Sequence, residues 1–131
     1  MSHFTTVKTV VRDKAVLCET LRHLHYEFRE GERLPIRGYS GQNTYGQVVV
    51  NTGSGYDVGF QRQQDESFSV CADWWGVEGK TNIRQTSFLQ ALNQNYSHLA
   101  IQKQALKLGC IIESESVNEK GEIVMVVCEP V

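Results

Sequence analysis

The chain has 131 residues, of which 40% are hydrophobic and 21% are charged, and its formal net charge is -2 at pH 7. This length and composition predict one globular domain over residues 1–131. They exclude a membrane span and a general electrostatic attraction to nucleic acid or anionic lipid, and with no apolar leader they indicate a soluble, intracellular protein.

Four cysteines are scattered through the chain, at Cys18, Cys71, Cys110 and Cys128. None of them forms a CxxC motif or another paired-ligand spacing. Isolated cysteines of this kind are typical of reduced, buried thiols in a cytosol-like compartment. The sequence therefore predicts no metal ligand and no cofactor.

Residues 3–11 predict the first strand, because β-branched side chains occupy alternate positions. Asp13 is the expected N-cap of a first helix. The apolar stripe of this helix, with spacings of four, three and four residues, consists of Leu17, Leu21, Leu24 and Phe28. Gly31 is expected to end the helix, and the glycines and Pro35 of residues 30–46 predict a long loop with a short strand near residues 35–39.

Residues 47–51 predict a short strand, and residues 56–77 then hold the densest strand pattern of the chain. Alternating stretches at residues 56–61 and 68–73 predict an antiparallel hairpin closed by a polar linker. Asp57 and Asp73 fall on the face away from Phe60 and Phe68, where we expect both carboxylates to be solvated. Trp74 and Trp75 are adjacent, so on an extended chain one points into the core and the other to the surface.

Residues 76–86 predict a second loop, which leads into a helix that begins near Ser87 and ends before Gly109. Its predicted inner side consists of Phe88, Leu92, Tyr96, Leu99, Lys103 and Leu106. Residues 110–117 and 122–128 predict two strands, and the turn signal of residues 118–121 joins them as a hairpin. The terminal position of the last strand predicts a free edge at which a second copy of the chain can pair.

These elements predict an α+β fold in two layers, an antiparallel sheet with two helices on one face, in the order β-α-β-β-β-α-β-β. The helix stripes and the inward residues of the strands would form one core. A lone hairpin is marginal in water, so the helices must cover the apolar face of residues 56–72.

The sequence leaves three functional hypotheses open. In the first, a non-enzymatic domain binds a protein through Trp74, Trp75 and Asp73 together with Arg37 and Tyr39, since an exposed tryptophan is a typical interface anchor. In the second, a small enzyme gathers Asp73, Arg37, Tyr39 and Cys71 in one cleft. In the third, Tyr39, Tyr45 and nearby arginines bind single-stranded nucleic acid, although Glu27, Glu30 and Glu32 cancel most of their charge.

Four stretches of the chain resemble one known family, namely the opening MSHFTTVKTVVRD, the YDVGF strand, the CADWWGV segment and the NYSHLAIQKQALKLG helix. This is the hypothetical chloroplast reading frame thirty-five family, a domain of unknown function of cyanobacteria and algal plastids. The resemblance covers nearly the whole chain. It implies a small protein of the cyanobacterial cytoplasm or plastid stroma, with no assigned activity, no catalytic residues to carry over, and a small ferredoxin as a suggested redox partner.

Overall fold

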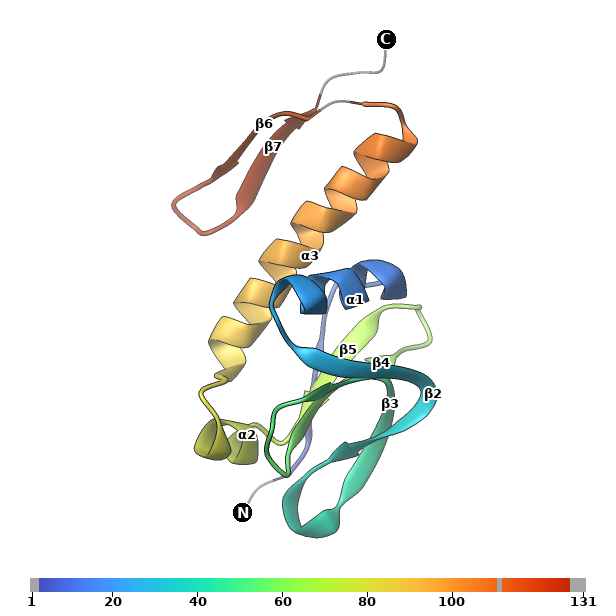
Figure 1. The fold of residues 1–131 in the computed structure, drawn as a ribbon, viewed down its shortest axis with the longest axis vertical. Helices are drawn as coiled ribbons and strands as arrows, with labels where there is room; N and C mark the ends of the chain where they lie inside the picture. The colour runs from blue at the N-terminus through green and yellow to red at the C-terminus, as the bar shows by residue number, and fades with distance from the viewer. Residues whose placement is uncertain (1–2, 111, 128–131) are drawn as a thin grey trace.

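The computed structural model describes residues 3–110 and 112–127 (Figure 1). The elements, in chain order, are β1 (Thr5–Lys8), α1 (Lys14–His23), β2 (Glu27–Arg37), the 3-10 helix η1 (Tyr39–Gly41), β3 (Asn43–Asn51), β4 (Asp57–Arg62), β5 (Phe68–Ala72), α2 (Trp74–Lys80), α3 (Gln85–Lys107), β6 (Ile112–Val117) and β7 (Ile123–Val127). Cys128, at the end of the last predicted strand, lies outside the described residues.

The strands form a five-stranded antiparallel sheet in the order β1-β5-β4-β3-β2, and β6 pairs with β7 in a separate two-stranded sheet. The predicted α+β class is confirmed. The observed order has one strand, β2, and one short helix, α2, more than the predicted one, and the last hairpin does not join the main sheet. Within the described residues, both outer strands of the main sheet, β1 and β2, have a free edge.

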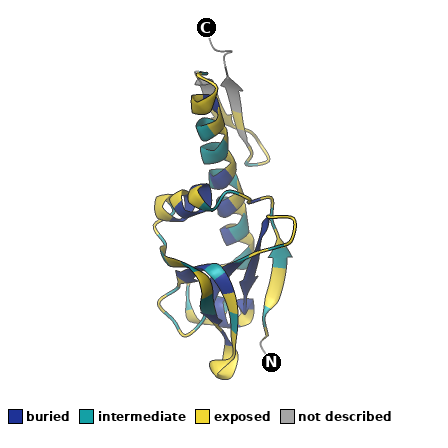
Figure 2. Cartoon of the chain, turned by 90° about the vertical axis from the view of Figure 1, so that its right-hand side faces the viewer, coloured by how far each residue is buried: buried dark blue, intermediate teal, exposed yellow. Residues whose placement is uncertain are grey.

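One face of the main sheet packs against α1 and α3, and this contact forms the larger part of the core (Figures 1 and 2). The strands contribute Val48, Val50, Val58, Phe60, Phe68, Val70 and Ala72, and the helices contribute Val16, Leu17, Leu21, Phe88, Leu92 and Tyr96. The alternate apolar side chains of residues 56–61 and 68–73 therefore lie on the face that packs against the helices, as predicted.

The first helix is shorter than predicted. Asp13 caps it as expected, because its side chain accepts hydrogen bonds from the backbone amides of Ala15 and Val16. The helix ends at His23, and His25 adopts a left-handed φ of 66° that turns the chain into β2. Phe28, predicted on the apolar stripe of the helix, instead pairs with Val50 of β3. Pairing with β3 gives hydrogen-bond partners to the backbone amide and carbonyl groups that a longer helix would have paired internally.

The prediction of a long loop over residues 30–46 is wrong, apart from the short strand expected near residues 35–39, which overlaps β2. Most of this segment is a hairpin of β2 and β3 with its turn at residues 38–42. The register of the pair shifts between Glu30 and Leu34, which bends the hairpin. Its outer half folds over the second face of the sheet, where Ile36 packs with Val49 and Cys71.

The packing of Ile36 requires a glycine on β4, the strand on the far side of β3 from β2. A Cβ atom built at Gly59 would overlap with the Cδ1 and Cγ1 atoms of Ile36. The folded-over hairpin is therefore fitted to the second face of the sheet, and this fit fixes the position of its tip.

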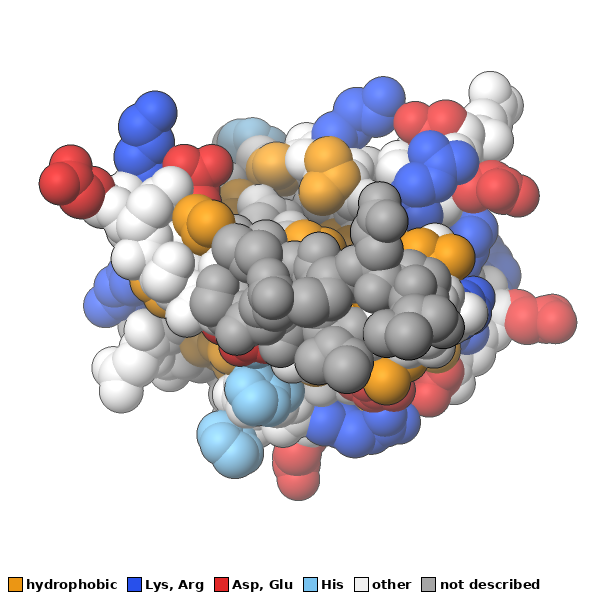
Figure 3. Space-filling model, turned by 90° about the horizontal axis from the view of Figure 1, so that it is seen from above, with side chains coloured by type: hydrophobic (Ala, Val, Ile, Leu, Met, Phe, Trp, Pro, Cys, Tyr) orange, Lys and Arg blue, Asp and Glu red, His pale blue; other side chains and the backbone are white. Residues whose placement is uncertain are grey.

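The helix α3 begins beside the sheet and continues past it to the hairpin of β6 and β7 (Figure 1). Gly109 follows it with a φ of 70°, which agrees with the predicted helix end. Leu106, predicted on the inner side, is 79% exposed because this part of α3 has passed the sheet. Figure 3 looks onto this end of the molecule, where apolar and charged side chains are interspersed. Among the described helices, none combines the length and hydropathy needed to traverse a bilayer.

Candidate partner-binding site

The two tryptophans lie at the start of α2, in a segment that the sequence predicted as the end of a strand followed by a loop. Trp74 is 6% exposed and packs against Phe88, with their ring centroids 5.7 Å apart. Trp75 is 71% exposed. Consecutive residues of a helix point about 100° apart, so the short helix also directs the two indoles to different sides.

A close contact with the loop before β4 holds α2 in place. A Cβ atom built at Gly76 would overlap with the ring of Tyr56, so only a glycine permits this approach. Together with the packing of Trp74 on Phe88, this contact makes α2 a fixed platform. The exposed indole of Trp75 is therefore presented from a well-packed element.

Asp73 caps α2, and its position corrects the prediction of a solvated carboxylate. The residue is 1% exposed, and its Oδ1 atom accepts a hydrogen bond from the Gly76 amide at 3.3 Å. The strand β5 leads directly into α2 at this point, so the short side chain turns inward to the helix start rather than out to solvent. The buried Oδ2 atom of Asp73 and the Nε1 atom of Trp74 have no hydrogen-bond partner among the described residues.

Arg37 lies on the hairpin near its tip and forms an ion pair with Asp57. Its Nε and Nη2 atoms donate to the two carboxylate oxygens at 2.9 Å, and its backbone amide donates to Oδ2 at 2.8 Å. Asp57 is 1% exposed because the folded-over hairpin covers this end of β4. The prediction that the Asp57 carboxylate is solvated is therefore wrong as well. The hydrogen bond to Asp57 raises the pKa of Arg37 above its usual value. Arg37 therefore balances a buried charge.

The hairpin tip, defined here as Arg33, Tyr39 and Tyr45, carries two exposed aromatic rings. Tyr39 is 44% exposed and Tyr45 is 40% exposed. The guanidinium of Arg33 lies over the Tyr45 ring, 3.8 Å from its centroid. No acidic residue occurs between Arg33 and Asp57 in the sequence. Tyrosine and arginine are enriched in protein interfaces, so this composition suits a contact surface.

The structure brings Asp73, Trp74 and Trp75 together and places Arg37 and Tyr39 apart from them on the β2–β3 hairpin. Both groups lie towards the same end of the molecule, where α2 and the hairpin tip are found (Figure 1). Within the described part of the chain, no hydrogen bond or ion pair joins the two groups. Of the predicted set, Asp73 and Trp74 are buried, and the exposed residues lie in two separate patches, Trp75 on α2 and Arg37 with Tyr39 on the hairpin, rather than in one cleft.

Three of the four residues of the enzyme hypothesis have separate structural tasks, and the fourth, Tyr39, is exposed on the hairpin. Asp73 caps α2, Arg37 balances Asp57, and Cys71 packs with Ile36 on the second face of the sheet. Burial raises the pKa of the Cys71 thiol, which opposes formation of a nucleophilic thiolate. Surface cavities of about 530, 370 and 570 Å³ are lined by other residues.

Sequence reasoning missed the ion pair of Arg37 with Asp57 and the burial of Asp73. A carboxylate at the first position of a strand gives no local signal that it will be buried. The covering element, the folded-over hairpin, is known only from the tertiary structure. For a cofactor, residues 3–110 and 112–127 contain no group of three or more histidine, cysteine or acidic side chains that could hold a metal ion.

A family model described as "Protein of unknown function (DUF1257)" matches residues 20–126. An "Uncharacterized protein ycf35" of Guillardia theta is 31% identical over 129 residues, covering 94% of this chain and 93% of the relative. A protein of the same name from Cyanophora paradoxa is 26% identical over 127 residues, covering 97% of this chain and 96% of the relative. No solved structure matches the chain. The predicted kinship is thereby confirmed, and the chain belongs to the DUF1257 family of proteins of unknown function, together with the ycf35 proteins of algae.

Proposed function

We propose that this member of the family is a non-enzymatic accessory domain that binds a protein partner in the cyanobacterial cytoplasm or plastid stroma. The observation that carries the proposal is the 71% exposure of Trp75 on the packed helix α2. An exposed indole is costly in water, and covering it with a partner removes a large apolar area from solvent.

The support for a binding role comes from the rigidity of the surroundings of Trp75. The neighbouring Trp74 is anchored on Phe88, and Gly76 is in contact with Tyr56. An anchor that is ordered before binding loses little conformational entropy when the partner arrives. Aromatic side chains presented in this way often contribute most of the binding energy of an interface.

The hairpin tip provides a second contact patch towards the same end of the molecule. Arg33, Tyr39 and Tyr45 offer aromatic and cationic groups, and the chain from Arg33 to Tyr56 carries no acidic residue, although Glu32 directly precedes Arg33. Such a surface favours a partner with acidic side chains at its rim. A small ferredoxin is the redox partner to test first, as the family resemblance suggests.

The test compares the proteins retained by wild-type chain, by Trp75→Ala and by a matched control, Val10→Ala, from an extract of the native organism. Val10 is 72% exposed, so both substitutions remove an exposed apolar side chain. We expect Trp75→Ala to weaken partner retention by about tenfold or more, as for a central interface residue, and Val10→Ala to leave it unchanged.

Direct titration of the retained partner, or of a small ferredoxin, measures the same difference as a dissociation constant. Circular dichroism confirms that Trp75→Ala is folded, which is expected because the indole contributes little to the core. Equal retention of every partner by wild type and Trp75→Ala would show that this surface is not the binding site.

A further inference from the structure

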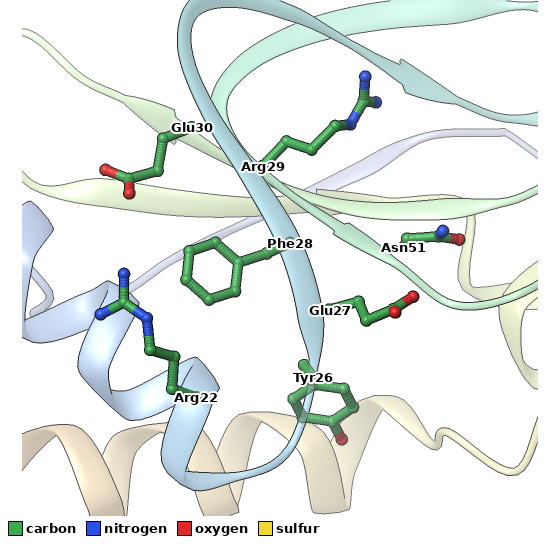
Figure 4. A pocket seen from close by; sticks show the side chains of 7 residues that line it. All are labelled: Arg22, Tyr26, Glu27, Phe28, Arg29, Glu30 and Asn51. Carbon is green, nitrogen blue, oxygen red and sulfur yellow. The ribbon is translucent and has the colours of Figure 1, made fainter.

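The strand β2 is the last strand of the main sheet, and the first half of its outer edge is open among the described residues. A cavity of about 530 Å³ follows this edge and is lined by residues 26–30 together with Arg22 of α1 and Asn51 of β3 (Figure 4). An edge strand presents backbone amide and carbonyl groups that have no neighbouring strand, so it can accept another extended segment.

The side chains of this edge alternate between the two faces of the sheet. Phe28 and Glu30 point to the side of α1, whereas Glu27 and Arg29 point to the opposite side (Figure 4). The guanidinium of Arg22 lies over the Phe28 ring, 5.3 Å from its centroid.

Glu27 and Arg29 are exposed, and within residues 3–110 and 112–127 neither side chain forms an ion pair or a hydrogen bond. They lie two positions apart, on the same face of one strand. Opposite charges at this spacing are arranged so that the strand complements an antiparallel copy of itself.

We propose that β2 pairs with β2 of a second copy of this chain, antiparallel and about a two-fold axis through Phe28. In this register Glu27 of each copy lies opposite Arg29 of the other, and the two Phe28 side chains face each other. Both ion pairs form at once because a two-fold interface repeats every contact. This surface is separate from Trp75 and the hairpin tip, so the inference goes beyond the proposed function.

The charges select this register over its neighbours. Opposed residues of an antiparallel pair share a face, so a two-fold axis normal to the sheet must pass through a residue. An axis through Glu27 would place two glutamates opposite each other, and an axis through Arg29 would place two arginines opposite each other. Like charges at directly opposed positions are unfavourable, which leaves the axis through Phe28.

The length of the pairing is limited by the bend in β2. The register between β2 and β3 shifts after Glu30, so the regular edge ends there. The interface therefore covers residues 26–30 of each copy and is small. A small interface of this kind gives a weak dimer whose population rises with protein concentration.

The test is a charge exchange measured by sedimentation velocity over a concentration series. The wild-type chain should shift with concentration from its monomer mass of 14.8 kDa towards twice that mass. Glu27→Arg alone and Arg29→Glu alone each place like charges at both pairs, and each should weaken self-association by about tenfold or more. Exposed residues at other positions provide the matched controls, Glu119→Arg and Lys107→Glu, which should associate as the wild type does.

Mixing the two single variants restores both attractive pairs, because the chain with arginine at both positions then faces the chain with glutamate at both. The mixture should form heterodimers at the wild-type concentration, visible by native mass spectrometry with one isotope-labelled chain, and the double exchange should restore the homodimer. A monomeric wild type at all concentrations, undiminished association of the single variants, or a mixture that stays monomeric would each overturn the proposal. Heterodimer formation itself requires that both variants are folded.

Discussion

Asp57 is a charged residue that folding removes from water, and Arg37 balances it. The carboxylate is 1% exposed, whereas the side chain of Arg37 in the pair is 48% exposed. Nη2 of Arg37 also donates to the Ser54 carbonyl at 3.1 Å, so the guanidinium joins the hairpin to the turn before β4. A buried charge without its partner is strongly destabilising, which makes this pair a condition for the folded-over hairpin.

We predict that Arg37→Met lowers the free energy of unfolding by about 2–3 kcal/mol, because it leaves the Asp57 carboxylate buried without its counter-charge. The control Arg33→Met removes an arginine of the same hairpin that lies over a tyrosine ring, and it should cost less than about 1 kcal/mol. Urea unfolding measures both. In the double variant with Asp57→Asn, the combined effect should be smaller than the sum of the two single effects, and strict additivity would contradict the coupling.

At the scale of elements, the β2–β3 hairpin is the part of the fold that covers the second face of the sheet. Ile36 is completely buried there with Val49 and Cys71, while Phe4 and Leu34 pack at the margin of this cluster. In a three-layer fold, helices would cover this second face of the sheet. Here the hairpin covers it, through Ile36 packed closely against Gly59. The position of the hairpin tip, and hence of Tyr39, depends on this small contact.

Gly59→Ala should displace Ile36 and lower the free energy of unfolding by about 1–3 kcal/mol, the usual cost of overpacking a core. The matched control is Gly55→Ala, since nothing lies within 4 Å of a Cβ atom at Gly55. Thermal and urea unfolding compare the two variants. The double variant Gly59→Ala/Ile36→Ala should be more stable than additivity predicts, and an additive result would show that the two residues do not compete for space.

At the scale of the whole molecule, α3 connects the sheet layer with the corner between β1 and α1. The hydroxyl oxygen of Tyr96 accepts hydrogen bonds from the amides of Arg12 and Asp13, each at 3.0 Å. About two helical turns further along, Lys103 donates to the Asp13 carboxylate at 2.8 Å. The capping residue of α1 is thus held by a side chain of α3, so the two helices support each other.

The hydrogen bond from Lys103 lowers the pKa of Asp13 below its ordinary value of 3.8. The pair therefore stabilises the fold fully above the pKa of the unfolded chain, and this contribution is lost as the pH falls through the lower folded value. Lys103→Met should make the unfolding free energy decline less steeply between about pH 5 and pH 2. Urea unfolding across this range measures the slope, with Lys107→Met as the control, and equal slopes for Lys103→Met and wild type would contradict the linkage.

The hydrogen bonds of Ser67 to Asp65 and of His98 to Glu115 lower the pKa of those two carboxylates as well. The wild-type chain and both lysine variants should therefore all lose stability in acid. The quantity that tests the linkage is the difference between Lys103→Met and Lys107→Met in the slope of unfolding free energy against pH. Both variants retain Asp65 and Glu115, so the contributions of these two carboxylates cancel in that difference.

The elements that the sequence determined are those with a complete local signal. Asp13 caps α1, alternation gives β4 and β5, and the glycines at 109 and 121 end α3 and close the last hairpin. Each of these depends on neighbouring residues, because a cap, a period of two or a left-handed glycine is decided within a few positions. The α+β class and the family followed from the same patterns and motifs.

Tertiary structure decided the features that depend on residues far apart in the chain. Phe28 has a helical spacing from Leu24, yet it lies in β2 because Val50 of β3 supplies its strand partner. Asp57 and Asp73 are buried because the hairpin and α2 cover them. Trp75 is exposed and Trp74 is buried because the Trp74 indole packs against Phe88 of α3. Backbone pairing and side-chain burial between distant segments leave no trace in local periodicity, so they are settled only when the chain has folded.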